Sequence, residues 1–153
     1  MIIRLASSHF TLFLITVSIL IGAAGVMTVQ IEFLATNFQL NFIPAEVRME
    51  ENIIILIAAF GVFLEHRRWL LDRMYPDSMP ESVDVFDRYS HDIGVFLILT
   101  AIFMESVNLL FLALNNWGIE FPGLKYVEIT LLFAANLIAI ATIGLFGSRL
   151  LRN

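Results

Sequence analysis

Long runs of apolar residues constrain this chain more than any other feature of its sequence. Three such runs cover about residues 10–35, 93–114 and 127–146. Each holds about 20 or more residues, enough to cross the ~30 Å hydrocarbon core of a bilayer as a helix. Backbone groups in lipid must be hydrogen-bonded within the segment, which favours helices. Apolar residues make up 59% of the chain and charged residues only 15%, and both values deviate from soluble domains in the direction of membrane proteins.

A fourth span is predicted with charged ends. Its uninterrupted apolar run, Ile53–Leu64, holds 12 residues and covers only about 18 Å as a helix. Pro44 suits a first helical turn, and Trp69 restores interfacial character beyond the charged residues that follow Leu64. We therefore expect a helix at about residues 45–72. The predicted fold is all-α, a single integral membrane four-helix bundle over residues 1–153.

The first apolar run also resembles a secretory signal peptide, because one Arg precedes it and small residues lie within it. It continues through residues 26–35, which is long for a signal core and sufficient for a span. The sequence therefore predicts a retained first helix.

Lysine and arginine are distributed unevenly around the four spans, and this bias sets the orientation of membrane proteins. Only Arg48 and Lys125 fall on one side. The other side carries the remaining seven: Arg4, Arg67, Arg68, Arg73, Arg88, Arg149 and Arg152. We expect both the N- and C-termini to be cytoplasmic in a multi-pass protein of the cell membrane, the inner membrane if the source is bacterial.

Three polar residues lie deep inside the predicted spans. Glu105 is near the centre of the third span, Asn108 is one turn further along the same face, and Asn136 is at the centre of the fourth. Small residues around Asn136 allow close approach of helices, and polar side chains then bond between them. The sequence predicts a polar midplane layer of these three residues, within one chain or between copies.

Two interpretations of that layer compete. In the first, a protonated Glu105 donates a hydrogen bond that fixes helix association. In the second, Glu105 lines an aqueous path for protons or cations, because acids inside the membrane are frequently functional. The first predicts a homo-oligomer or a membrane subunit, and the second an ion or proton channel or transporter.

The loop between the second and third spans is predicted to be a cytoplasmic helical hairpin, residues 66–92, with the third helix starting near Met79. Charges alternate along it with aromatic and Met residues, a composition common at protein interfaces. The hairpin is thus a candidate docking surface for a cytoplasmic protein, or a charged membrane anchor. Its candidate residues are Glu65, His66, Arg67, Arg68, Asp72, Arg88 and His91.

Three histidines, His9, His66 and His91, are predicted at the cytoplasmic border. A haem or quinone anchor using this layer is a third alternative, with His66 and His91 as axial haem ligands. The spacing typical of di-metal carboxylate bundles is missing, and the chain has no cysteine. We therefore expect no metal site and no cofactor.

The formal net charge of −5 argues against a nucleic-acid partner, which would need a basic face. No nucleophile elbow, phosphate loop or zinc-ligand spacing occurs in the sequence. The sequence predicts a non-catalytic small membrane protein in contact with the lipid bilayer, oligomeric or a subunit of a larger assembly.

Overall fold

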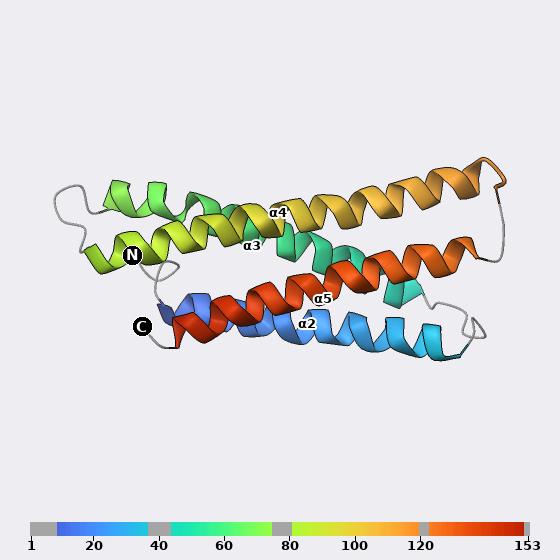
Figure 1. Cartoon of the computed structure of the whole chain (residues 1–153), viewed down its shortest axis with the longest axis horizontal. Helices are drawn as coiled ribbons and strands as arrows, with labels where there is room; N and C mark the ends of the chain where they lie inside the picture. The colour runs from blue at the N-terminus through green and yellow to red at the C-terminus, as the bar shows by residue number, and fades with distance from the viewer. Residues whose placement is uncertain (1–8, 37–43, 75–80, 120–122, 152–153) are drawn as a thin grey trace.

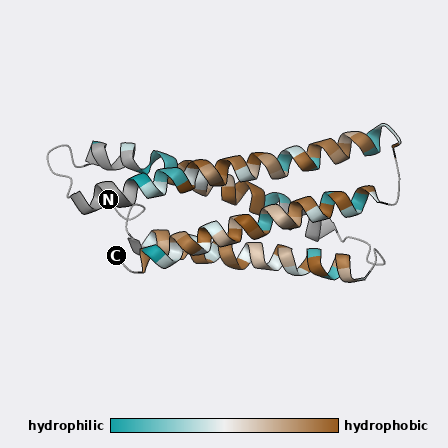
Figure 2. Ribbon diagram, viewed as in Figure 1, coloured by the Kyte–Doolittle hydropathy of each residue, from teal (hydrophilic) through white to brown (hydrophobic). Residues whose placement is uncertain are grey.

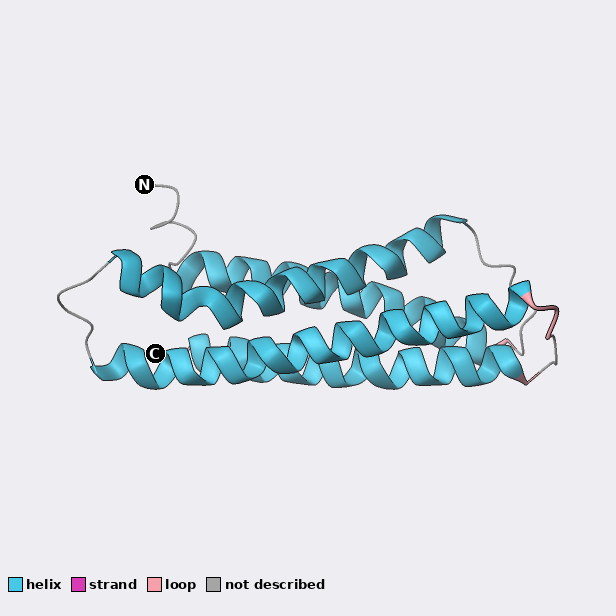
Figure 3. Cartoon of the chain, turned by 90° about the horizontal axis from the view of Figure 1, so that it is seen from above, coloured by secondary structure: helices cyan, strands magenta, loops and turns pink. Residues whose placement is uncertain are grey.

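A computed structural model describes residues 9–36, 44–74, 81–119 and 123–151 as four helices joined by short connections (Figure 1). The helices are α2 (His9–Ala35), α3 (Pro44–Met74), α4 (Glu81–Asn116) and α5 (Leu124–Leu150). Successive helices run antiparallel, and the described residues contain only helix and turn (Figure 3). At one end of the bundle α2 and α4 begin and α3 and α5 end. We call it the α3–α4 end, after the two helices that are joined there. The prediction of an all-α chain with four helices is confirmed.

Three of these helices are long and apolar enough to cross a membrane: Thr11–Ala35, Arg88–Asn116 and Leu124–Leu150. They coincide with three of the four predicted spans. Helix α3 forms as expected, but its charged ends keep it out of this class among the described residues. Helix α4 begins at Glu81, well before the apolar run. In Figure 1 the paired ends of α3 and α4 extend past the ends of α2 and α5.

Buried residues recur at alternating spacings of three and four along α2 and α5. This is the heptad spacing of helices that pack side by side with a small crossing angle. In α2 the buried series is Leu12, Thr16, Ile19, Ala23, Val26, Gln30 and Phe33. In α5 it includes Ile129, Leu132, Asn136, Ala139, Ile143, Phe146 and Leu150. The remaining faces stay apolar and exposed (Figure 2).

Two glycines bring α3 and α4 into backbone contact. A Cβ atom added to Gly94 would lie 2.6 Å from the Gly61 carbonyl oxygen and 2.6 Å from the Glu65 amide nitrogen. Neither atom belongs to a side chain that can move aside. Close approach of this kind is the role of small residues where membrane helices pack. The Gly61–Gly94 contact therefore fixes the register of the α3–α4 pair.

The helix boundaries follow from local chemistry. Pro44 is the first residue of α3, where a missing N–H does not interrupt the helix. Two residues after the end of α4, Gly118 has a left-handed φ of 71°. Gly118 N–H donates to Asn115 O, and Ile119 N–H donates to Leu114 O, both at 3.0 Å. This pair of bonds is the Schellman motif, which satisfies carbonyl groups at a helix end.

Candidate functional site

The central polar contact of the bundle joins α2 to α5. Asn136 Nδ2 donates a hydrogen bond to Gln30 Oε1 at 3.2 Å. The two residues are 0% and 3% exposed. Both side chains belong to the heptad stripes along which α2 and α5 pack. An amide pair in such a position holds two helices in register, because sliding them would leave buried polar groups unsatisfied.

Gln30 was missing from the residues expected on sequence grounds. Its only signal in the sequence is that it interrupts the first apolar run at a position in heptad spacing with Phe33 and Ile19. The expected partners of Asn136 were Glu105 and Asn108. The structure instead directs the Asn136 side chain toward α2, in the interior of the bundle.

Glu105 occupies a different place. It lies near the middle of the candidate span Arg88–Asn116, and its side chain is exposed. Asn108, one turn further along, is half-buried. Large apolar residues surround Glu105 on the same exposed side of α4, including Ile102, Leu109 and Leu112, each at least 56% exposed. The three predicted polar residues therefore differ in exposure: Asn136 is buried, Asn108 is half-buried and Glu105 is exposed.

The register of α3 against α4 shows which exposed polar residues of α3 lie at the level of Glu105. Gly94 of α4 contacts Gly61 and Glu65 of the antiparallel α3. Glu105 follows Gly94 by 11 residues, so it lies level with the residues of α3 that precede Gly61 and Glu65 by 11, which are residues 50–54. Glu51 and Asn52, in this stretch, are both exposed. Figure 2 shows a hydrophilic stretch of α3 within the length of the bundle, behind α5.

The polar side chains described at this level of α3 and α4 can donate or accept hydrogen bonds. They are the carboxyl groups of Glu51 and Glu105 and the amides of Asn52 and Asn108. Ser106 Oγ already donates to the Ile102 carbonyl oxygen at 2.7 Å, within its own helix. In the part of the chain that the structure describes, no three His, Asp or Glu residues gather as a metal site would require.

The candidate docking residues lie at the α3–α4 end with unequal exposure. His66, Arg88 and His91 are exposed and Glu65 is half-buried, whereas Arg67 is only 4% exposed. The side chains of Arg68 and Asp72 lie outside the described residues. Arg67 therefore faces the bundle rather than the exposed surface of the hairpin.

The two described histidines contact backbone carbonyl groups. His91 Nδ1 lies 3.4 Å from the Glu65 carbonyl oxygen on α3. His66 Nδ1 lies 3.1 Å from the Val62 carbonyl oxygen and also contacts the Glu65 carboxylate. In each ring, Nδ1 is the nitrogen that makes these contacts. The His91 contact joins α4 to α3. The side chain of His9 lies outside the described residues.

An aromatic stack lies at the α3–α4 end of the bundle, and the sequence did not predict it. The Arg149 guanidinium lies 3.8 Å from the centroid of the Tyr89 ring. Tyr89 stacks on Phe146 at 6.5 Å between centroids, and Phe146 meets Phe60 edge-on at 5.9 Å. The stack joins α3, α4 and α5 where their apolar segments end.

Among the described residues, polar groups thus occur as a buried amide pair, as exposed carboxyl groups at one level of α3 and α4, and as a charged and aromatic end of the bundle. Comparison with models of protein families, with curated proteins and with solved structures finds no match.

Proposed function

We propose that this chain is a non-catalytic integral membrane protein that spans the bilayer with its four helices and assembles with a second copy of itself. The assembling surface is the exposed side of α4 that carries Glu105, together with the adjoining edge of α3. The buried Gln30–Asn136 pair contributes to the fold of each copy. Glu105 contributes to the contact between copies.

One observation carries the proposal: a carboxyl group is exposed near the middle of an apolar span. A charged side chain at the bilayer centre costs at least about 2.5–3.5 kcal/mol. Within one chain Glu105 is exposed, so lipid would surround it if the protein were alone. A neighbouring copy removes this cost by replacing lipid with hydrogen-bonding groups.

A second copy offers suitable chemistry in a two-fold arrangement. In an isologous contact the same surface is used by both partners, so Glu105 of each copy meets the Glu105–Asn108 stretch of the other. A protonated carboxyl donates one hydrogen bond and accepts others, and the Asn108 amide does both. Leu109 and Leu112 on the same side, 57% and 56% exposed, supply packing around the polar contact.

The projecting hairpin of α3 and α4 is proposed as the surface for a cytoplasmic protein, with the chain oriented as its Lys and Arg distribution predicts. Its exposed side chains include Trp69, Arg73 and Arg88. Aromatic and Arg residues are enriched where proteins bind one another. The Arg73 guanidinium lies 5.5 Å from the centroid of the Trp69 ring, so both are presented together.

Disulfide cross-linking in native membranes tests the proposed contact, and the cysteine-free chain gives a clean background. Leu109→Cys and Leu112→Cys lie on the proposed contact side, and Ile138→Cys on the exposed side of α5 is the matched control. We expect oxidised dimers from the first two variants and little from the third. Equal cross-linking of all three would show random collision and would contradict a specific α4 contact.

A second candidate function is a proton or cation path between copies. It is favoured by the placement of the exposed Glu51 of α3 level with Glu105 of α4, because carboxyl groups between subunits attract hydrated cations. Flux measurements in liposomes separate the two functions. A path predicts flux in the unchanged protein that Glu105→Gln abolishes while cross-linking through Leu109→Cys persists. Assembly without a path predicts cross-linking without flux.

A further inference from the structure

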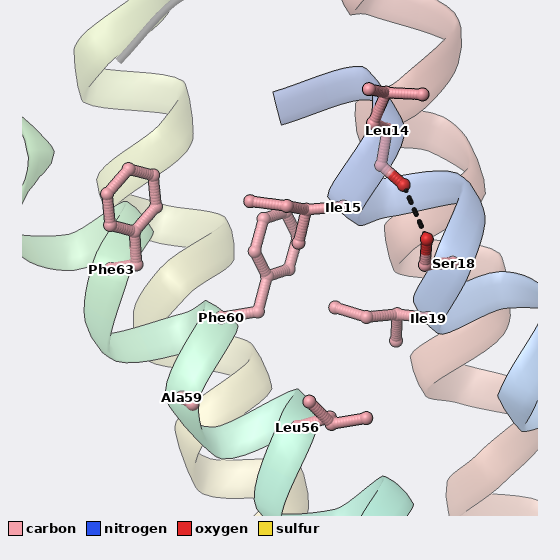
Figure 4. A pocket seen from close by; sticks show the side chains of 8 residues that line it. All are labelled: Leu14, Ile15, Ser18, Ile19, Leu56, Ala59, Phe60 and Phe63. Atoms are coloured by element: carbon pink, nitrogen blue, oxygen red, sulfur yellow. Dashed lines mark hydrogen bonds between the residues drawn. The ribbon is translucent and has the colours of Figure 1, made fainter. Parts of the chain in front are cut away.

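An apolar groove of about 440 Å³ opens between α2 and α3 (Figure 4). Four residues of α2 form one wall and four of α3 form the other. They are Leu14, Ile15, Ser18 and Ile19 on α2, and Leu56, Ala59, Phe60 and Phe63 on α3. The hydroxyl of Ser18, the one polar side chain, donates to the Leu14 carbonyl oxygen at 2.9 Å. The groove therefore presents hydrocarbon throughout.

The groove exists because α2 and α3 touch and then separate. Ile53 packs onto Gly22, where an added Cβ atom would lie 2.5 Å from Ile53 Cδ1. From this contact toward the α3–α4 end, α3 crosses obliquely away from α2 (Figure 1). The space between them is lined but not filled by Phe60 and Phe63.

Arg67 stands at the α3–α4 end of the groove. It is one helical turn past Phe63 and in heptad spacing with Phe60, so it lies on the face of α3 that lines the groove. Its side chain is 4% exposed, so this positive charge is held within the protein at that end. Trp69, two residues on, is 57% exposed, as expected for an aromatic residue at a membrane–water interface.

The distance along α3 from the inner end of the groove to Arg67 matches the thickness of one lipid leaflet. Helix α3 rises about 16 Å from Leu56 to Arg67 at ~1.5 Å per residue. Half of a ~30 Å hydrocarbon core is about 15 Å. An acyl chain that reaches Leu56 near the bilayer centre therefore has its phosphate at the level of Arg67. A guanidinium binds phosphate oxygens through two parallel hydrogen bonds.

We propose that this groove is a binding site for an anionic phospholipid, with one acyl chain between α2 and α3 and the phosphate at Arg67. The positive charge of Arg67 favours anionic headgroups over zwitterionic ones. The lipid fills the space between the separating helices and ties α2 to α3 where they do not touch. This site is independent of the α4 contact surface.

Quenching by brominated lipids tests the site in reconstituted protein. The two tryptophans, Trp69 and Trp117, are replaced by Phe, and Phe63→Trp becomes the reporter in the groove. Leu145→Trp, at a 63% exposed position of α5, is the matched reporter of ordinary surrounding lipid. We expect brominated phosphatidylglycerol to bind near the groove reporter about three- to fivefold more tightly than brominated phosphatidylcholine. At the α5 reporter the ratio stays near one.

Two further variants assign the preference to Arg67. Arg67→Gln is expected to lower the preference for phosphatidylglycerol over phosphatidylcholine at the groove reporter to the value at the α5 reporter. The charge-matched control Arg88→Gln should retain most of that preference. Native mass spectrometry of the chain with its own aromatic residues gives an independent reading: one retained phosphatidylglycerol, lost in Arg67→Gln. If the groove reporter binds phosphatidylglycerol and phosphatidylcholine equally tightly while Arg67 is present, the proposed site is wrong. If the preference for phosphatidylglycerol persists in Arg67→Gln, the proposed phosphate contact is wrong.

Discussion

The amide of Asn136 on α5 donates to the side-chain oxygen of Gln30 on α2, across 3.2 Å and with both residues buried. These residues are separated by 106 positions in the sequence, yet they are the polar centre of the helix pair that begins and ends the bundle. Around them the contacting residues are apolar, so sliding α2 along α5 would break the amide bond first. The pair defines which heptads of the two helices meet.

This contact predicts a non-additive pair of substitutions. Asn136→Leu and Gln30→Leu should each destabilise the folded protein by about 1–2 kcal/mol, because each removes the buried hydrogen bond between the two amides. The double variant should lose less than the sum of the two, since no polar group remains. Unfolding titrations in mixed micelles measure the cycle. Additive losses would show that the two amides do not interact.

Backbone contact between Gly61 and Gly94 predicts a strong effect of one methyl group. Gly94→Ala should destabilise the protein by about 1–3 kcal/mol, the range found for overpacked cores, and should weaken the α3–α4 pairing. The control is Gly144→Ala, because an added Cβ atom there meets no atom within 4 Å. That control should be neutral or slightly stabilising through helix propensity. Thermal unfolding followed by circular dichroism compares the two variants, and equal melting temperatures would contradict the close contact.

The end of α4 predicts a penalty set by backbone conformation alone. Gly118 has a φ of 71° with no atom within 4 Å of an added Cβ, so Gly118→Ala should cost about 1–2 kcal/mol through the left-handed conformation. Gly118→Asn should cost less, because Asn tolerates that region. The same unfolding assay reads both, and an Ala variant as stable as Gly118 itself would argue against the Schellman ending.

The aromatic stack at the α3–α4 end predicts a graded series at Tyr89. Tyr89→Phe keeps a ring beneath Arg149 and against Phe146, and should retain most of the stability. Tyr89→Leu removes the ring and should lose about 0.5–2 kcal/mol from the cation–π contact and the stacking. Phe and Leu variants of equal stability in the unfolding assay would show that the ring itself contributes nothing.

Much of the fold could be predicted because it depends on how long each apolar run is compared with the thickness of a bilayer. The runs around Phe33, Ile102 and Ala139 are long enough to span a bilayer, and prolines mark the breaks between helices. The packing could not be predicted in the same way. Every face of these helices is apolar, so hydrophobic periodicity does not distinguish the face toward the core from the face toward lipid. For this reason the sequence does not predict the Gly61–Gly94 contact, which fixes the α3–α4 register.

The same limit applied to the polar residues. The sequence marks Glu105 and Asn136 as polar residues inside apolar runs, but depth alone does not say which way a side chain points. Asn136 falls on the buried heptad stripe of α5 and meets Gln30, whereas Glu105 falls on the exposed side of α4. The rotation of each helix about its axis separates residues of similar depth.

Subunit counting in a bilayer tests the assembly through Glu105 most directly. The protein is labelled with one fluorophore, reconstituted at low density in liposomes, and counted by single-molecule photobleaching. The account predicts two bleaching steps for the unchanged protein and for Glu105→Gln, which keeps hydrogen-bonding groups at this position. It predicts mainly single steps for Glu105→Leu. Single steps for the unchanged protein, or two steps for Glu105→Leu, would contradict it.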